Sequence, residues 1–563
     1  KAVQKSGAVG DVSLLHFGVA NGPEPDRPLP DMPDLDELLE GKNEPHVEYW
    51  TRQQADQRYP WFSNIDMADM KRWMDQVKTY GWDILAIRSI WPDLEMLPGV
   101  TRFEQLDELV QHAKNNGQTV MLGCSIWGDR GEAVWNDWLP MRDQHGNVRP
   151  RIWPAAAYDP RSKQGKSQFW KNLAAHYRDE TAMVGYHILG SSLGGSVRPE
   201  PTRTDYAQAT REAFAEWLDS KGRENHPMAD LLAIPMVNVA DLGPDLSQEW
   251  LNVTEFWADT NKEAVKAYLE AIRAVDTERP VIVDRKPFPW ALGNIIPLLR
   301  EDGNAALKNE GSPRFGDVIL RTISVQAGVP YLGELHRHVP TSRALADTIY
   351  FWESLWADYG FWIQRWRYHQ FKEQWESGTD PLRNTVPEVL AFMKETQPHW
   401  NRYMELPYEV PDVLVFCSRA SENLGGLRRG FFDDFAGGRT FSALFRRLQV
   451  PAFAANEYAE WVDLDAFKIV FTEGNIQVPE AVDRLTAYAE SGGKLVLVGD
   501  AGEFTAGRAD RCRSLRRQVS DLPNVKQIDA PHRLEIEGVR EWSAPFTLPR
   551  DEVESLLRWA GVE

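Results

Sequence analysis

Several residues that could do chemistry lie at the ends of predicted strands. Glu334 lies in "YLGELH", where an apolar run ends, and His336 and His338 follow it. A carboxylate at this point can act on a substrate, or it can be a structural residue in an ion pair with a neighbouring histidine. The residue types alone leave both interpretations open.

A second strand, "MVGYHILGSS" (183–192), ends on Ser191 and Ser192 and has no carboxyl group. An aliphatic hydroxyl is far too weak an acid to replace a carboxyl group tuned near neutral pH. Period-two alternation puts His187 on the side of Ser191 and opposite Tyr186. His187 is therefore either a ligand contact or a satisfied interior histidine.

Metal and nucleotide chemistry have little support. The "HRH" run at 336–338 has two histidines at strand spacing, but no carboxylate with metal-site spacing accompanies it. The "ENLGG" segment lacks the spacing of a dinucleotide-binding glycine turn. We therefore expect no metal and no cofactor.

Composition limits the class of partner. The 563 residues are too many for one ordinary core and indicate two or three domains. A formal net charge of −20 argues against nucleic acid and anionic membranes as partners. No apolar run reaches the length of a membrane span. The chain starts with Lys1, so we expect the native N-terminus to be absent, and the compartment stays open.

Strands and helices alternate from about residue 12 to 370, within a predicted barrel domain of residues 1–400. Near-continuous apolar runs between amphipathic ones indicate a parallel sheet covered on both sides. Eight of these units predict an α/β (β/α)₈ barrel, in which chemistry occurs at the carboxyl ends of the strands. The predicted strands are 13–20, 83–91, 118–127, 183–192, 279–286, 316–326, 328–338 and 359–369.

A second α/β pattern covers residues 405–530. The apolar runs at 411–418, 467–474 and 494–500, with a helix at 479–493, predict a small doubly wound domain. Residues 531–563 are too few for a large core, so we expect a short C-terminal segment that is rich in strands or cut short.

In their shared order, several segments resemble glycoside hydrolase family 42, the β-galactosidase-like family. They are "NDWLPMRDQHGNVRP", "AAYDPRSKQGKSQFWKNLAAHYRDETAMVGYHI", "REAFAEWL", "ERPVIVD", "VPYLGELHRHVPT", "FWIQRWRYH" and "LTAYAESGGKLVLVGD". The resemblance covers most of residues 64–500. It implies a barrel joined to a flavodoxin-like domain that makes trimer contacts, and a homotrimer.

The resemblance also implies roles for residues. Glu334 matches the nucleophile that ends strand seven of the family. Arg88, on strand two, is suitably placed to hydrogen-bond that carboxylate, although a barrel-interior ion pair predicts the same geometry. The remaining candidate sugar contacts are His187, His336 and the strand-end tryptophans Trp91, Trp127 and Trp366, for which core packing is the alternative.

The acid/base position departs from the family. The family pattern on strand four is Gly-Trp-Gln-Ile-Asp-Asn-Glu, whereas this chain has Gly185-Tyr186-His187-Ile188-Leu189-Gly190-Ser191. A carboxylate from elsewhere could replace the missing group, and the candidates are Glu200, Asp129, Asp159 and Asp284. Alternatively, the chain is a natural member that binds sugar without cleaving it. It could also be a variant that originally had glutamate at 191 or 192, although a change at 191 would not account for Gly190.

The sequence thus predicts a retaining β-glycosidase that acts on a β-galactoside or related oligo- or polysaccharide. The acid/base is replaced at Ser191 or Ser192. The alternative is a non-catalytic carbohydrate-binding protein with the same fold.

Overall fold

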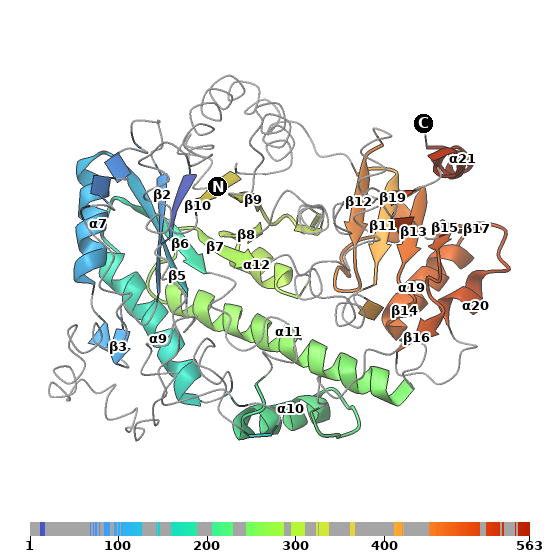
Figure 1. The fold of residues 1–563 in the computed structure, drawn as a ribbon, viewed down its shortest axis with the longest axis horizontal. Helices are drawn as coiled ribbons and strands as arrows, with labels where there is room; N and C mark the ends of the chain where they lie inside the picture. Colours follow the sequence, from blue (N-terminus) through green and yellow to red (C-terminus); the bar gives the residue numbers. More distant parts are fainter. Residues whose placement is uncertain are drawn as a thin grey trace.

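The computed structural model contains a closed barrel of eight parallel strands, as the sequence predicts (Figure 1). The strand order is β1-β10-β9-β8-β7-β6-β5-β2. The bounds are β1 Val12–His16, β2 Ile84–Ile90, β5 Thr119–Ser125, β6 Met183–Ile188, β7 Val281–Arg285, β8 Ala305–Asn309, β9 Tyr331–His336 and β10 Phe361–Arg365.

The structure describes only part of the chain. The longer described ranges are 12–16, 84–90, 95–97, 103–125, 160–188, 205–228, 244–285, 294–309, 326–336, 361–365, 410–418, 450–506, 514–529 and 550–562. Single residues and pairs are described at 68, 71–72, 74–75, 78, 100–101, 142, 145–146, 158, 323–324, 420–421, 532–533 and 546–547. The sequence also predicts helices at 341–357 and 438–448, and both lie outside these ranges.

Helices cover the outside of the barrel. They are α7 Glu104–Asn115, α9 Pro160–Tyr177, α11 Pro244–Arg273 and α12 Ile296–Asp302. Helix α10 Gln208–Ser220 packs on α11, farther from the strands (Figure 1). The apolar face of α7 is buried, with Leu106, Leu109, Val110 and Ala113 in the core. Gly117 follows that helix with a φ of 66°, a left-handed conformation that favours glycine.

On the barrel strands whose side chains are described, the two faces have different surroundings. Leu85, Leu122 and Leu307 belong to the large hydrophobic cluster between strands and helices. Met121, Ile282 and Ala306 are also buried but lie outside that cluster. Because successive residues of a strand point to opposite faces, the second set marks the interior face of the barrel.

The prediction of the sixth strand is wrong. We expected a strand over 316–326, but Ile323, Ser324 and Gln326 are helical, and the sixth strand is β8 at 305–309. The segment "VILRTISV" is rich in β-branched residues, whereas β8 reads "AALKN", with two alanines and a lysine. Tertiary pairing with β7 and β9 outweighs the weak local preference for strand.

The small domain has a five-stranded parallel sheet in the order β12-β11-β13-β15-β17, which is the flavodoxin-like arrangement. Its strands are β11 Val413–Cys417, β12 Ala452–Ala455, β13 Ile469–Glu473, β15 Lys494–Val498 and β17 Val525–Ile528. Its helices are η4 Leu464–Ala466, α19 Pro479–Glu490 and α20 Leu515–Val519. The short pairs are β3 Glu95–Leu97 with β4 Val100–Thr101, β14 Ile476–Gln477 with β16 Phe504–Thr505, and β18 His532–Arg533 with β19 Phe546–Thr547.

The C-terminal segment is mainly helical where it is described, not rich in strands. Helix α21 (Arg550–Ala560) follows the short β18–β19 pair and packs on the small domain. Lys494 donates a hydrogen bond to the Trp559 carbonyl, and the Lys526 ammonium lies over the Trp559 ring. These contacts join the segment to the small domain.

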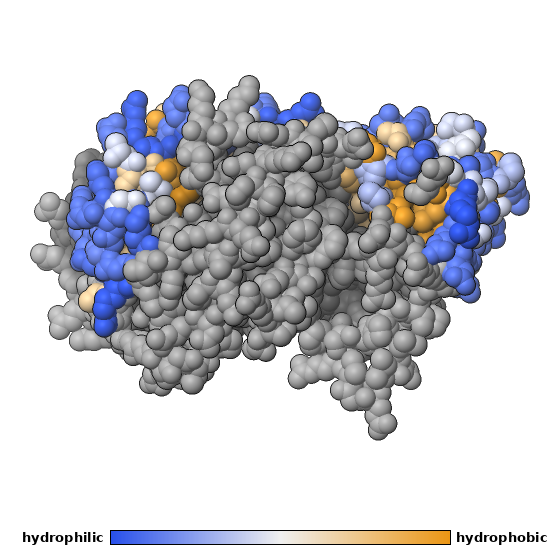
Figure 2. Space-filling model, turned by 90° about the horizontal axis from the view of Figure 1, so that it is seen from above, coloured by the Kyte–Doolittle hydropathy of each residue, from blue (hydrophilic) through white to orange (hydrophobic). Residues whose placement is uncertain are grey.

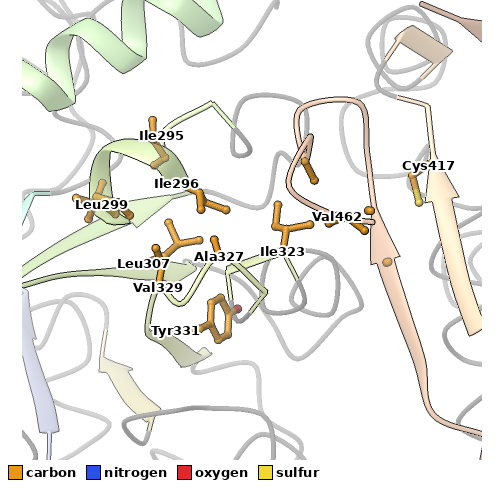
Figure 3. Packing of buried hydrophobic residues seen from close by; sticks show 14 of the residues in the cluster. Ile295, Ile296, Leu299, Leu307, Ile323, Ala327, Val329, Tyr331, Cys417 and Val462 are labelled. Atoms are coloured by element: carbon orange, nitrogen blue, oxygen red, sulfur yellow. The ribbon is translucent and has the colours of Figure 1, made fainter. Parts of the chain in front are cut away.

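The two domains contact each other through the turn before β9. The Trp461 Nε1–H donates to the Ile323 carbonyl at 3.0 Å, and Ile323 lies close to Val462 (Figure 3). Seen from above, the described surface is mostly hydrophilic, with an apolar area on the small domain (Figure 2). Among the described helices, none has the length and apolar character of a membrane span.

Candidate active site

Strand β9 brings the predicted nucleophile to the interior of the barrel. Tyr331 is buried in the outer hydrophobic cluster, so positions 332, 334 and 336 of this strand share the interior face. Glu334 is third from the carboxyl end of β9 and pairs with Trp362 on β10. His336 is the last residue of the strand and pairs with Gln364.

Tyr186 and His187 point to opposite faces of strand β6, as the period-two alternation predicted. The Tyr186 hydroxyl points outward and donates to Asp276 at 2.8 Å. Burial, and this bond to the Asp276 carboxylate, raise the pKa of Tyr186 far above its usual value. His187 is completely buried, on the opposite face and one residue before the end of β6.

Gly123 leaves room for the His187 ring. A Cβ atom on Gly123 would lie 3.1 Å from Nδ1 and 3.2 Å from Cβ of His187. That spacing is tighter than an ordinary van der Waals contact, so glycine at 123 fits the ring without displacing it. The register also pairs Gly123 with Arg88 on β2. Arg88, Gly123 and His187 thus form one row across three neighbouring strands.

The sequence analysis did not predict that two charged residues, Asp284 and Lys308, would lie next to each other on the interior face. Asp284 on β7 was considered only as a substitute acid, and Lys308 on β8 was missed because the strand itself was misassigned. They pair with each other in the register, each one residue before its strand ends. The interior-face positions therefore bring together Arg88, His187, Asp284, Lys308, Glu334 and His336.

Other predicted site residues lie outside the described part of the chain. They are Ser191, Ser192, Trp91, Trp127 and Trp366, with the substitute acids Glu200, Asp129 and Asp159. Within the described ranges, no group of three or more histidine, cysteine, aspartate or glutamate side chains could hold a metal ion. The Cys417 thiol is buried and donates a hydrogen bond to the Glu473 carboxyl group.

A buried carboxylate joins the segments that follow β5 and β6. Asp205 accepts hydrogen bonds from the backbone N–H groups of Arg142 and Ala207, both at 3.0 Å, and from the Thr210 hydroxyl at 2.6 Å. Lys166 of α9 is also buried. Burial lowers the pKa of Lys166 to about 8, although the Asp205 charge acts in the opposite direction. Together these groups connect α9, the start of α10 and the segment at Arg142.

The comparisons with known proteins identify the fold. No family model matches this chain. No curated protein matches it either. Among solved structures, the β-galactosidase from Bacillus circulans sp. alkalophilus superposes with a TM-score of 0.59 and 12% identity, covering 80% of this chain and 72% of that one. The β-galactosidase from Halorubrum lacusprofundi gives 0.58 and 16%, covering 79% and 74%.

A third similar structure carries a different name. The exo-carrageenase GH42 from Bacteroides ovatus superposes with a TM-score of 0.57 and 11% identity, covering 86% of this chain and 69% of that one. At these identities the likeness concerns the fold. This chain therefore has the fold of the GH42 glycoside hydrolases, a group that includes β-galactosidases.

Proposed function

We propose that this chain is a retaining β-glycosidase, with Glu334 as its nucleophile and a β-galactoside or related glycan as its substrate. The observation that carries the proposal is the position of Glu334 on the interior face of β9, near the carboxyl end of a barrel strand. Catalytic residues of (β/α)₈ enzymes lie at these ends. The similar structures named β-galactosidase and exo-carrageenase support a carbohydrate substrate.

In the proposed reaction, the Glu334 carboxylate attacks the anomeric carbon and the glycosidic C–O bond breaks. Water then hydrolyses the glycosyl-enzyme ester and frees the carboxylate. A second carboxyl group, about 5–5.5 Å from the first, normally protonates the leaving oxygen and later activates the water. In this chain that position falls on Ser191 or Ser192.

The proposed sugar contacts belong to the same set of strand ends. Arg88, His187 and His336 occupy interior-face positions, which supports a role in holding the sugar. Trp91, Trp127 and Trp366 remain candidate stacking surfaces on the basis of the sequence. Of the proposed substitute acids, Asp284 also occupies an interior-face position, on β7.

The second candidate function is carbohydrate binding without cleavage. It is favoured by the loss of both residues that end the family pattern on strand four, the Asn at Gly190 and the Glu at Ser191. In this case sugars bind to the barrel and no variant at 191 or 192 restores hydrolysis.

Hydrolysis of a panel of aryl β-galactosides tests the proposal, using the parent chain, Ser191→Glu, Ser192→Glu and Glu334→Gln. We expect one glutamate variant to gain at least about 10²-fold, the lower part of the range for a general acid. Adding Glu334→Gln to that variant should abolish the gain.

The other outcomes separate the alternatives. If the parent already hydrolyses the panel freely and both glutamate variants are slower, the acid lies elsewhere, and Glu200 and Asp159 are the next positions to change. If no chain cleaves a broad oligosaccharide panel but sugars still bind, the proposal fails and carbohydrate binding replaces it.

We also propose that the chain assembles into a trimer through its small domain. The flavodoxin-like strand order of that domain supports the proposal, because the family that the chain resembles uses such a domain in trimer contacts. Light scattering tests the proposal, and a monomer at micromolar concentration would count against the trimer but not against the barrel.

A further inference from the structure

Lys308 is a completely buried cation inside the barrel. It is one residue before the end of β8 and has no exposed surface. The preceding residue, Leu307, packs outward near Leu299 and Ile296 of α12 (Figure 3). Strand alternation therefore puts Lys308 on the interior face. Lysine is almost never fully buried without a charged or hydrogen-bonding partner.

The strand register puts Lys308 between two carboxylate positions. It pairs with Asp284 on β7 and with Leu332 on β9. Glu334 is two residues beyond Leu332 on the same face of β9. With strands about 4.8 Å apart and a rise of about 3.3 Å per residue, the Cα atoms of Lys308 and Glu334 are roughly 8 Å apart. A lysine and a glutamate side chain together can bridge that separation.

We propose that Lys308 is a positioning residue that keeps the Glu334 carboxylate ionised and oriented for attack. The inference rests on the proposed function, because it assumes that Glu334 is the nucleophile. An opposite charge within about 4–6 Å favours the ionised carboxylate, which is the reactive form. Because Asp284 pairs with Lys308 in the register, its carboxylate would share the ammonium and weaken the effect on Glu334. The other titratable groups at interior-face positions are His16, Arg88, His187 and His336.

The pH dependence of covalent labelling reports the ionisation of the Glu334 carboxyl group separately from the step that needs a general acid. The probe is 2,4-dinitrophenyl 2-deoxy-2-fluoro-β-galactoside. A Glu334 oxygen forms a bond to the anomeric carbon, and the bond to the phenol oxygen breaks with its electron pair leaving as dinitrophenolate. This leaving group needs no general acid, so the missing carboxyl group does not matter. Intact-protein mass spectrometry follows the labelling rate from pH 4 to pH 9.

We expect the labelling rate of the parent to rise with pH through one midpoint. Lys308→Met should move that midpoint upward by about one pH unit, and so slow labelling roughly tenfold below it, because one nearby cation is lost. Lys308→Arg retains the charge and should stay near the parent. The matched control is Lys166→Met, which removes a buried lysine of α9 and should leave the midpoint unchanged.

Asp284→Asn keeps the inference testable if Lys308→Met does not fold. With one carboxylate fewer near Lys308, the midpoint should move downward. A folded Lys308→Met with the parent's midpoint overturns the inference, and so does an unchanged midpoint in Asp284→Asn. If the probe labels Glu334 without these shifts, only the inference fails. If the parent is not labelled, the nucleophile assignment fails and the inference fails with it.

Discussion

Glu473 is a buried carboxyl group at the end of strand β13 in the small domain. Burial raises its pKa to about 8, although a hydrogen bond from the Cys417 thiol acts in the opposite direction. Among the residues that the structure describes, none forms a hydrogen bond with its Oε2 atom. Glu473 therefore keeps its proton in the folded chain at neutral pH, whereas in the unfolded chain it ionises above its ordinary pKa of 4.5.

This difference makes the stability of the small domain depend on pH. Between pH 5 and pH 8 the folded chain holds one proton more than the unfolded chain, so the free energy of unfolding falls as pH rises. Glu473→Gln removes the titration. We expect its stability relative to the parent to increase between pH 5 and pH 8, by on the order of a few kcal/mol. Urea unfolding at both pH values measures the change.

An exposed glutamate of the same domain provides the control. Glu490→Gln, at the end of α19, should give the same difference from the parent at pH 5 and pH 8. If Glu473→Gln behaves in the same way as Glu490→Gln, the Glu473 carboxyl group is not protonated in the folded chain.

At the scale of elements, the sequence predicted most of the barrel because most of its strands contain a short, strongly apolar run. The runs that became β2, β5, β6, β7 and β9 lie within about four residues of the predicted positions. Strand β8 was missed because its residues have little local preference for a strand. Its pairing with β7 and β9 is a non-local effect that no short window contains.

The candidate site was predicted less completely for the same reason. Glu334, His187 and Arg88 were found because each lies in a strongly apolar strand, and the register puts them on one face. Lys308 carries no recognisable motif in "AALKNEG". Gly303, which ends α12 in a left-handed conformation, is the signal that could have indicated a strand beginning at 305.

Asp205 determines how helix α10 begins. It accepts three hydrogen bonds, and its charge opposes the loss of the proton from buried Lys166. We expect Asp205→Ala to destabilise the chain by about 3–5 kcal/mol, because it leaves a buried cation without its carboxylate. Urea unfolding of the parent and the variant measures the loss.

A second change separates the charge from the hydrogen bonds. In Asp205→Ala with Lys166→Met, the buried cation is also gone, so the double variant should recover part of the stability lost by Asp205→Ala. Asp219→Ala, at an exposed position of α10, is the matched control and should change stability little. Equal losses in the single and double variants would mean that Lys166 and Asp205 do not interact.

At the scale of the whole molecule, the small domain holds the turn from which β9 starts. The Ile323 carbonyl accepts hydrogen bonds from the Trp461 indole of the small domain and from the Ala327 N–H of its own turn. Val329, at the end of that turn, donates to the Ser324 carbonyl. Strand β9, which carries Glu334, begins two residues later.

Replacing Trp461 by phenylalanine tests this connection because it keeps an aromatic ring but removes the donor. A net hydrogen bond contributes about 1 kcal/mol, so the Tm should fall by about 2–4 °C. Hydrogen exchange followed by mass spectrometry should show faster exchange over 323–329, where the Ala327 and Val329 amides lie. Trp559→Phe changes a tryptophan of α21 and should leave that exchange unchanged. If Trp461→Phe also leaves it unchanged, the turn is held by the barrel alone, and the small domain has no mechanical connection to the strand of the proposed nucleophile.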